Sequence, residues 1–135
     1  MNSDKFIGIP HKFNGNDYDG CDCIGLVRLF YKENEWGLDF WDNGEPVTLE
    51  NYHSLDSWTR LLRYLKKHFK ETKNIDELEY GAVVMFNINS DLHLGVYIGN
   101  GDMLSMQIPS IEGRTRSTIY RKKIWKHVFR RGFNR

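Results

Sequence analysis

Two cysteines stand two residues apart near the start of the chain, and the second precedes an apolar run. The segment reads Gly20-Cys21-Asp22-Cys23-Ile24-Gly25-Leu26-Val27. Asp22 is a good N-cap residue, because its carboxylate can accept from the free N–H groups of a first helical turn. Cys23 would then be the first helical residue, where the unpaired N–H groups and the helix dipole favour a thiolate. The chemistry that this arrangement predicts is nucleophilic attack by sulfur.

Both cysteines also have simpler interpretations. A cysteine before an apolar run is often a small buried hydrophobic residue, and a catalytic one needs a base elsewhere in the chain. A disulfide between Cys21 and Cys23 would be strained. The pair could supply half of a zinc site completed by His11 and His93, but the chain has only 2 cysteines. We therefore expect neither a metal nor another cofactor.

Two amphipathic helices are predicted to hold the core. The first begins at Cys23 and ends between Asn34 and Gly37, and the second begins after Ser54. The apolar stripe of the first is formed by Ile24, Val27, Phe30 and Tyr31, with Leu26 and Leu29 beside it. That of the second is formed by Trp58, Leu61, Leu62, Leu65 and Phe69.

Beyond the second helix the hydrophobic period changes to that of strands. Strands are expected over 82–88, 92–98, 103–108, 117–121 and 126–133. The Asn-Gly pair within 99–102 predicts a tight hairpin turn with positive φ at both central residues. In the second strand, alternation puts His93 on the face opposite the apolar side chains. Loops are expected over 6–20, which contains His11 and Tyr18, and over 38–52.

The length and composition indicate one globular domain over 1–135. Apolar residues make up 40% of the chain, which is enough for a core, and the N-terminus shows neither a signal peptide nor a membrane span. We therefore expect a chain made in a cytoplasm and exported, if at all, by another route.

Charge is unevenly distributed along the sequence. Residues 114–135 contain nine Lys and Arg and no Asp or Glu. Aromatic and aliphatic residues interrupt these charges, so the pattern favours a folded closing strand with a solvated basic face over a nucleic-acid site. The same face could also dock on an acidic partner or on the acidic remainder of the chain.

Taken together, these motifs resemble the NlpC/P60 family of papain-like cysteine peptidases. The segment 8–15 is similar to the family's Gly-x-Pro-Tyr lead-in, and 22–27 to its Asp-Cys-Ser-Gly-Leu-Val nucleophile motif. The segment 80–86 is similar to its Pro-Gly-Asp strand, and 93–101 to its histidine strand. The run 25–31 and the basic, aromatic C-terminus are similar to the phage-tail branch of the family.

The resemblance implies an α+β fold in which the cysteine helix and a second helix pack on a meandering antiparallel sheet. It implies that Cys23 is the nucleophile and His93 its base, with the backbone N–H of Cys23 donating to the oxyanion. The substrate would be a peptidoglycan stem peptide, cleaved through a thioester. His11, Tyr18 and Asp22 would contact that substrate.

The sequence departs from the family pattern at three positions. The residue that orients the histidine falls at Ser105, which is short, and Gln107 on the same strand face is the alternative. His11 replaces the lead-in tyrosine and brings a second imidazole toward the thiol. Ala82 replaces the usual aspartate.

Two functions from different classes follow. The first is a peptidoglycan endopeptidase carried on a phage tail, made in the host cytoplasm and located in the virion, with other tail proteins as partners. The second is a structural tail-tip component with an idle fold. Another thiol hydrolase or acyltransferase of the same fold is a third interpretation. None of them involves nucleic acid or membrane insertion.

Overall fold

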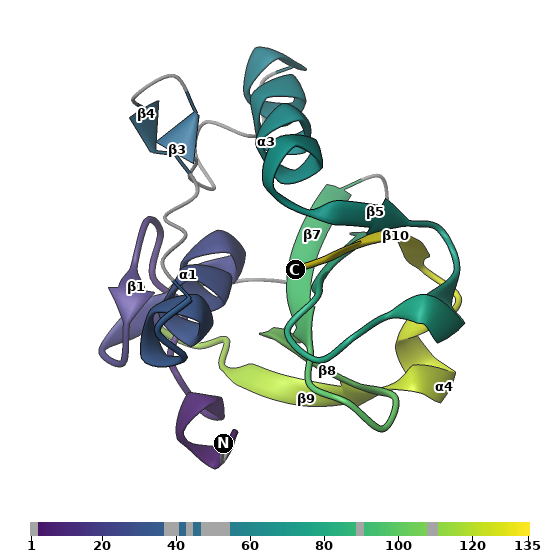
Figure 1. Ribbon diagram of the computed structural model, residues 1–135. Helices are drawn as coiled ribbons and strands as arrows, with labels where there is room; N and C mark the ends of the chain where they lie inside the picture. The colour runs from purple at the N-terminus through teal and green to yellow at the C-terminus, as the bar shows by residue number, and fades with distance from the viewer. Residues whose placement is uncertain (1–2, 37–40, 43–44, 47–54, 89–90, 108–110) are drawn as a thin grey trace.

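One six-stranded antiparallel sheet forms the centre of the computed structural model, which describes residues 3–36, 41–42, 45–46, 55–88, 91–107 and 111–135. The strands lie in the order β5-β10-β6-β7-β8-β9, so β6 to β9 form a meander and β10 returns beside β6 (Figure 1). Helices lie outside this sheet, which confirms the predicted α+β class. The strands are β5 (Lys70–Thr72), β6 (Val83–Ile88), β7 (Asp91–Tyr97), β8 (Asp102–Met106), β9 (Ser117–Arg121) and β10 (Phe129–Asn134).

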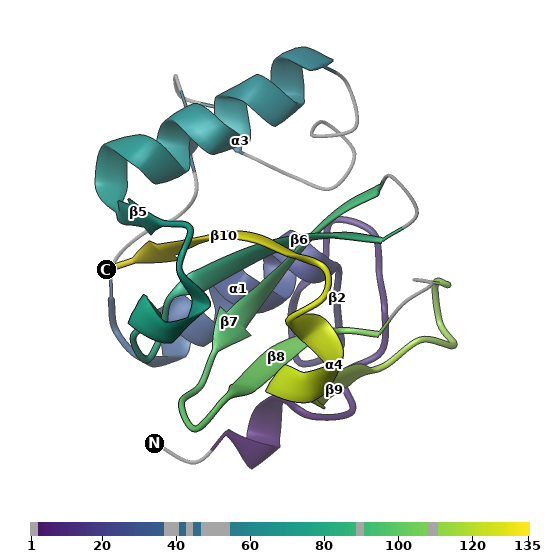
Figure 2. The ribbon, with the colours of Figure 1, turned by 90° about the vertical axis from the view of Figure 1, so that its right-hand side faces the viewer.

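The first helix, α1 (Cys23–Glu33), begins at the predicted residue and packs against β7 and β8. Its C-cap is Asn34, and the predicted stop Gly37 lies outside the described residues. The whole predicted apolar stripe is buried, so packing on the sheet fixes the rotation of the helix. Figure 2 shows α1 lying behind the sheet. Its buried residues are Cys23, Ile24, Gly25, Leu26, Val27, Leu29, Phe30 and Tyr31.

The second predicted helix is α3 (Leu55–His68). Leu61 and Leu65 are fully buried and belong to the same hydrophobic cluster as α1, which confirms the core stripe. The predicted cap Ser54 and the side chain of Trp58 lie outside the described residues. In the described part of the chain, no helix combines the length and the hydropathy that a membrane span requires.

The segment before α1 is tied to the edge strand β9. It contains η1 (Asp4–Phe6), β1 (Asn16–Asp17) and β2 (Gly20–Cys21). The N–H of His11 donates to the carbonyl of Thr115 at 2.7 Å, and His11 also forms a parallel bridge with Cys21. The lead-in therefore connects β9 to the residues that begin α1.

The hairpin turn between β7 and β8 has the predicted backbone. Asn100 has φ 54° and Gly101 has φ 81°, so both central residues are in the left-handed region. This region is accessible to Asn and Gly at low cost, which explains why the Asn-Gly pair marks the turn.

Several short elements do not appear in the sequence pattern. The helix α4 (Lys122–Trp125) separates β9 from β10, and η2 (Ile75–Glu77) follows β5. A four-residue helix is too short to show a hydrophobic period. A two-stranded sheet also pairs β3 (Trp41–Asp42) with β4 (Glu45–Pro46), within the segment expected to be a loop.

The two faces of the central sheet belong to two separate hydrophobic clusters. Leu92, Leu94 and Val96 of β7 pack in the cluster that contains α1. The opposite face carries Phe86, in a smaller cluster with Trp125 of α4. Figure 2 shows α4 on the side of the sheet away from α1. The alternation predicted for β7 is therefore confirmed: its apolar side chains face α1.

Candidate active site

Cys23 occupies the first position of α1, and its side chain is only 3% exposed. The N–H groups of a first helical turn have no partners within the helix, and together with the helix dipole they favour a negative charge at this point. A thiol placed here is in an environment that favours the thiolate, the reactive form of cysteine. The position is thus suited to a nucleophile.

Asp22 determines this position through two hydrogen bonds. One carboxylate oxygen accepts from the N–H of Gly25 at 2.6 Å, and the other accepts from the N–H of Asn14 at 2.8 Å. The side chain is 1% exposed, so it is buried between the helix and the lead-in. The structure thus gives Asp22 a capping and positioning role, and its expected contact with substrate stays a prediction.

The neighbouring thiol of Cys21 is in an unfavourable environment for reaction. It is fully buried and donates to the carbonyl of Asp17 at 3.1 Å. Burial, followed by the negative charges of Asp22 and Asp17, raises the pKa of Cys21 to about 12. Of the two cysteines, Cys21 is therefore excluded as a nucleophile near neutral pH.

His93 lies near the start of β7, opposite Phe86 of β6. The two rings are stacked with centroids 5.6 Å apart and an angle of 24° between their planes. The imidazole therefore leaves β7 on the face that carries Phe86, while the neighbouring Leu92 and Leu94 face α1. Its side chain is half-buried rather than sealed in the core.

The start of α1 and the start of β7 lie at the same end of the sheet. Strand β8 is antiparallel to both β7 and β9, and its last residue Met106 pairs with Ser117 at the start of β9, so β7 and β9 begin at the same end of the sheet. The lead-in joins this end, since His11 is bonded to Thr115 just before β9 and is bridged to Cys21. The structure thus brings the elements that carry Cys23 and His93 to one end of the sheet. That the thiol and the imidazole share a proton stays a prediction.

The two candidates for orienting His93 differ in their surroundings. Ser105 is fully buried opposite Gly95, and its hydroxyl donates to the carbonyl of Leu94 at 2.8 Å. Continuing this register by two residues brings Gln107 level with His93, and the Gln107 side chain is exposed. The hydroxyl proton of Ser105 is thus used by the backbone, while its oxygen keeps lone pairs that can accept from an imidazole N–H. Which of the two residues orients His93 stays a prediction.

His11 is buried beside this end of α1. Its side chain is 1% exposed, and neither ring nitrogen has a hydrogen-bond partner among the described residues. The ring packs edge-on against Phe13, with centroids 4.7 Å apart. Sequence reasoning placed His11 near the thiol, and the backbone bridge to Cys21 agrees with that placement.

Lowering the pH is expected to destabilise the fold through His11. Burial lowers the pKa of this imidazole from 6.5, although the carboxylates of Asp22 and Glu112 oppose the shift. Just below pH 6.5 the unfolded chain therefore binds more protons than the folded chain, so stability falls as pH falls through this window. Between about pH 7.5 and about pH 5.5, the free energy of unfolding measured with urea should fall more for the wild type than for His11→Phe. If the free energy of unfolding fell equally in the wild type and in His11→Phe, groups other than His11 would cause the pH dependence.

Tyr18 lies away from the other candidates. Its ring stacks on Phe6 at 6.1 Å, and its pKa is raised by burial and by the nearby Glu33 carboxylate. Glu33 is the last residue of α1 and Cys23 the first. An eleven-residue helix separates its two ends by roughly 15 Å. The structure therefore places Tyr18 near the end of α1 that is far from Cys23, and its contact with substrate stays a prediction.

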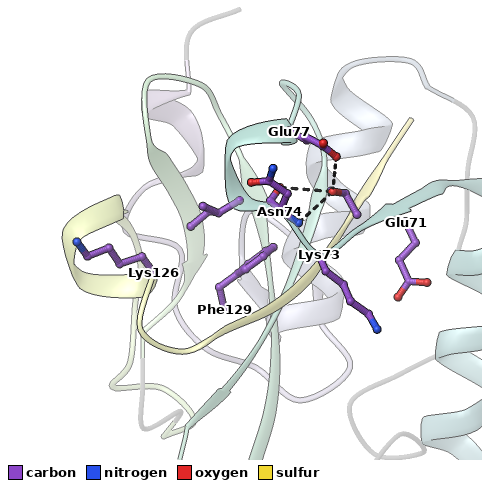
Figure 3. A pocket seen from close by; sticks show the side chains of 8 residues that line it. Glu71, Lys73, Asn74, Glu77, Lys126 and Phe129 are labelled. Atoms are coloured by element: carbon purple, nitrogen blue, oxygen red, sulfur yellow. Dashed lines mark hydrogen bonds between the residues drawn. The ribbon is translucent and has the colours of Figure 1, made fainter.

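A surface hollow of about 850 Å³ does not contain these residues (Figure 3). It lies around β5 and η2, whereas the lead-in joins the opposite edge of the sheet at β9. Its polar groups already bond one another, since Thr72 donates to Glu77 at 2.8 Å and accepts from the N–H of Asn74. Across the described residues, no group of three or more His, Cys, Asp or Glu is arranged to hold a metal ion.

Comparison with known proteins identifies the family. The model of the NlpC/P60 family matches residues 8–132, and the chain belongs to this family. A search of the curated proteins gave no significant match.

Two solved structures share the fold. The NlpC/p60 domain of the peptidoglycan hydrolase SagA is 14% identical, with a TM-score of 0.60, over 97% of this chain and 91% of that one. NlpC1 from Trichomonas vaginalis is 16% identical, with a TM-score of 0.60, over 96% of this chain and 39% of that one. The α+β, NlpC/P60-like architecture expected from the motifs is thus confirmed.

Proposed function

We propose that this chain is a cysteine peptidase that hydrolyses the stem peptides of peptidoglycan. The observation that carries the proposal is Cys23 at the capped start of α1 in a chain of the NlpC/P60 family. The raised pKa of Cys21 leaves Cys23 as the thiol that can react. The similar domain of SagA belongs to a peptidoglycan hydrolase, which supports the substrate class.

The proposed reaction is acyl transfer through sulfur. His93 takes the proton of Cys23, and the thiolate attacks the carbonyl carbon of an amide bond. The backbone N–H of Cys23 donates to the oxyanion that forms. The imidazolium then protonates the leaving amine, which departs and leaves a thioester. Water attacks the thioester, and the products are a carboxylate and the free thiol.

We also place the protein on a phage tail, with other tail proteins as partners. This proposal rests on the similarity of 25–31 and of the basic, aromatic C-terminus to the phage-tail branch. A tail would carry the enzyme out of the host cytoplasm to the cell wall.

A structural tail component with an idle fold is the second candidate. One observation favours it: the position of the family's third residue is occupied by Ser105, whose side chain is short and whose hydroxyl proton is bonded to the carbonyl of Leu94. If neither the Ser105 oxygen nor Gln107 accepts from the imidazole N–H, His93 would be poorly oriented as a base.

Digestion of purified peptidoglycan tests the enzymatic proposal. We expect the purified protein to release stem-peptide fragments that mass spectrometry identifies, and the new termini would define the bond that is cleaved. Alkylation of the protein before digestion should abolish release. Absence of fragments from both Gram-positive and Gram-negative walls, with a folded protein, would favour the structural candidate.

A further inference from the structure

An apolar groove lies between α4 and the face of the sheet that α1 does not cover. Its volume is about 250 Å³, and it is lined by Phe86, Ile88, Met103, Tyr120, Ile124, Trp125 and Val128. The floor is formed by Phe86, Met103 and Trp125, which are at most 2% exposed. Ile124 is 57% exposed, more than any of the other large apolar side chains of the described surface. The groove therefore combines a packed floor with an open apolar edge.

The size of this groove limits what it can hold. Pockets for small-molecule ligands usually begin at roughly 300 Å³ and combine apolar walls with several polar groups. This groove is slightly smaller, and none of its lining residues is charged. It has room for one large aromatic or aliphatic side chain, as in the anchor pockets that recognise short peptide segments.

Three exposed basic residues are close in sequence to residues that line the groove. Lys123 and Lys126 flank Ile124 and Trp125 in the sequence, and Arg130 follows two residues after Val128; all three are exposed. None of the three has an acidic partner among the described residues.

Neighbouring cations are paired instead. Arg121 bonds Asp102 at 2.6 Å, and Lys122 bonds Asp76 at 2.7 Å. Part of the basic segment is thus neutralised within the chain, whereas Lys123, Lys126 and Arg130 have no acidic partner among the described residues and can pair with an external one. Lys126 also lines the hollow around β5 and η2 with Glu71 and Glu77, and Figure 3 shows its side chain directed away from their carboxylates.

We propose that this groove binds an acidic segment of a partner protein. One aromatic or large aliphatic side chain of that segment fills the groove, and its flanking carboxylates pair with Lys123, Lys126 and Arg130. Burial of the apolar anchor supplies most of the affinity, while the charges select an acidic partner and speed its association. This inference concerns the face opposite α1 and does not depend on the proposed peptidase activity.

The arrangement favours a peptide over a nucleic acid. Single-stranded nucleic acids bind by stacking bases on exposed aromatic rings along a basic track. Here the rings of Phe86 and Trp125 are buried in the floor, and the most exposed lining residue is the aliphatic Ile124. An apolar anchor with acidic flanks matches both the lining and the charged surroundings.

Fluorescence anisotropy with three labelled peptides tests the proposal. The probe is Glu-Asp-Glu-Trp-Glu-Asp-Glu; the second peptide replaces Trp with Ala, and the third replaces every acidic residue with Lys. We expect saturable binding of the first peptide alone, weakened by added salt. Ile124→Glu should weaken binding about tenfold or more, since it places a charge at the anchor site. The double variant Lys123→Glu/Lys126→Glu should also weaken binding about tenfold or more, because the new carboxylates repel the acidic residues on either side of the tryptophan.

Matched controls separate the groove from general surface effects. Ile111 is 51% exposed and lies outside the groove, so Ile111→Glu should bind the probe like the wild type. Lys67 is exposed on α3, and Lys67→Glu should also have no effect. Equal binding of the Trp and Ala peptides, or undiminished binding by Ile124→Glu, would overturn the proposal. So would a thymidine oligonucleotide that binds more tightly than the probe and competes with it.

Discussion

Cys23→Ala is expected to abolish the release of stem-peptide fragments while leaving the protein folded. Removing a catalytic nucleophile usually lowers turnover by roughly 10³-fold or more, because the remaining groups cannot form the covalent intermediate. The lost sulfur is a small part of a well-buried helix start, so stability should fall by about 1 kcal/mol or less. The measurement is fragment release per unit time by the wild type and the variant, with circular dichroism as the check of folding.

The second cysteine offers a matched control for this variant. Cys21 is also buried, but its thiol donates to the carbonyl of Asp17 and its pKa is raised to about 12. Cys21→Ala should therefore lose a similar amount of stability and keep most of the activity. If both variants were equally active, sulfur chemistry at Cys23 would be disproved. If only Cys21→Ala were inactive, the nucleophile would have been assigned to the wrong residue.

Gly25→Ala is expected to be the most destabilising single-methyl change near the site. A Cβ at this position would overlap the carbonyl oxygen of Gly15, which packs on the first turn of α1. Backbone atoms cannot rotate away as a flexible side chain can, so the lead-in and the helix start must separate. We expect a loss of about 3 kcal/mol in the free energy of unfolding, and a large loss of activity because Asp22 and Cys23 move with the helix start.

Gly8→Ala is a control of the same chemical type. Gly8 has φ 84° but open space where the Cβ would lie, so the cost there is conformational only, about 1 kcal/mol. Chemical denaturation of both variants gives the comparison. Equal costs for the two would show that Gly15 and Gly25 are not in close contact in solution.

Much of the scaffold can be predicted from local rules. Asp22 and Cys23 mark a helix start because a capping carboxylate precedes an apolar period, and the structure begins α1 at Cys23. Asn100 and Gly101 mark the β7–β8 turn because positive φ suits these residues. The five predicted strands and both helices can be recognised because each segment is long enough to show a hydrophobic period of a strand or of a helix.

The features that sequence reasoning missed depend on tertiary contacts. The helix α4 has four residues, and its Trp125 is buried by distant elements, against Tyr97 of β7 and Phe129 of β10. Tyr18 belongs to the lead-in that is expected to line the substrate site, but the sequence pattern does not show that β1 and β2 fold this segment so that the Tyr18 ring stacks on Phe6. No spacing rule shows that the hydroxyl of Ser105 donates to the carbonyl of Leu94, whereas the strand register makes this visible.

The pH dependence of Cys23 alkylation by iodoacetamide, in the wild type and in His93→Gln, tests the central claim most directly. Mass spectrometry follows one site, because the thiol of Cys21, with a pKa of about 12, stays protonated over the range used. A nucleophile that transfers its proton to His93 should react in the wild type with a midpoint below about pH 7, and in the variant near the ordinary thiol value of about 8.5. A midpoint near 8.5 in both proteins would contradict the pairing of Cys23 with His93 and with it the proposed peptidase.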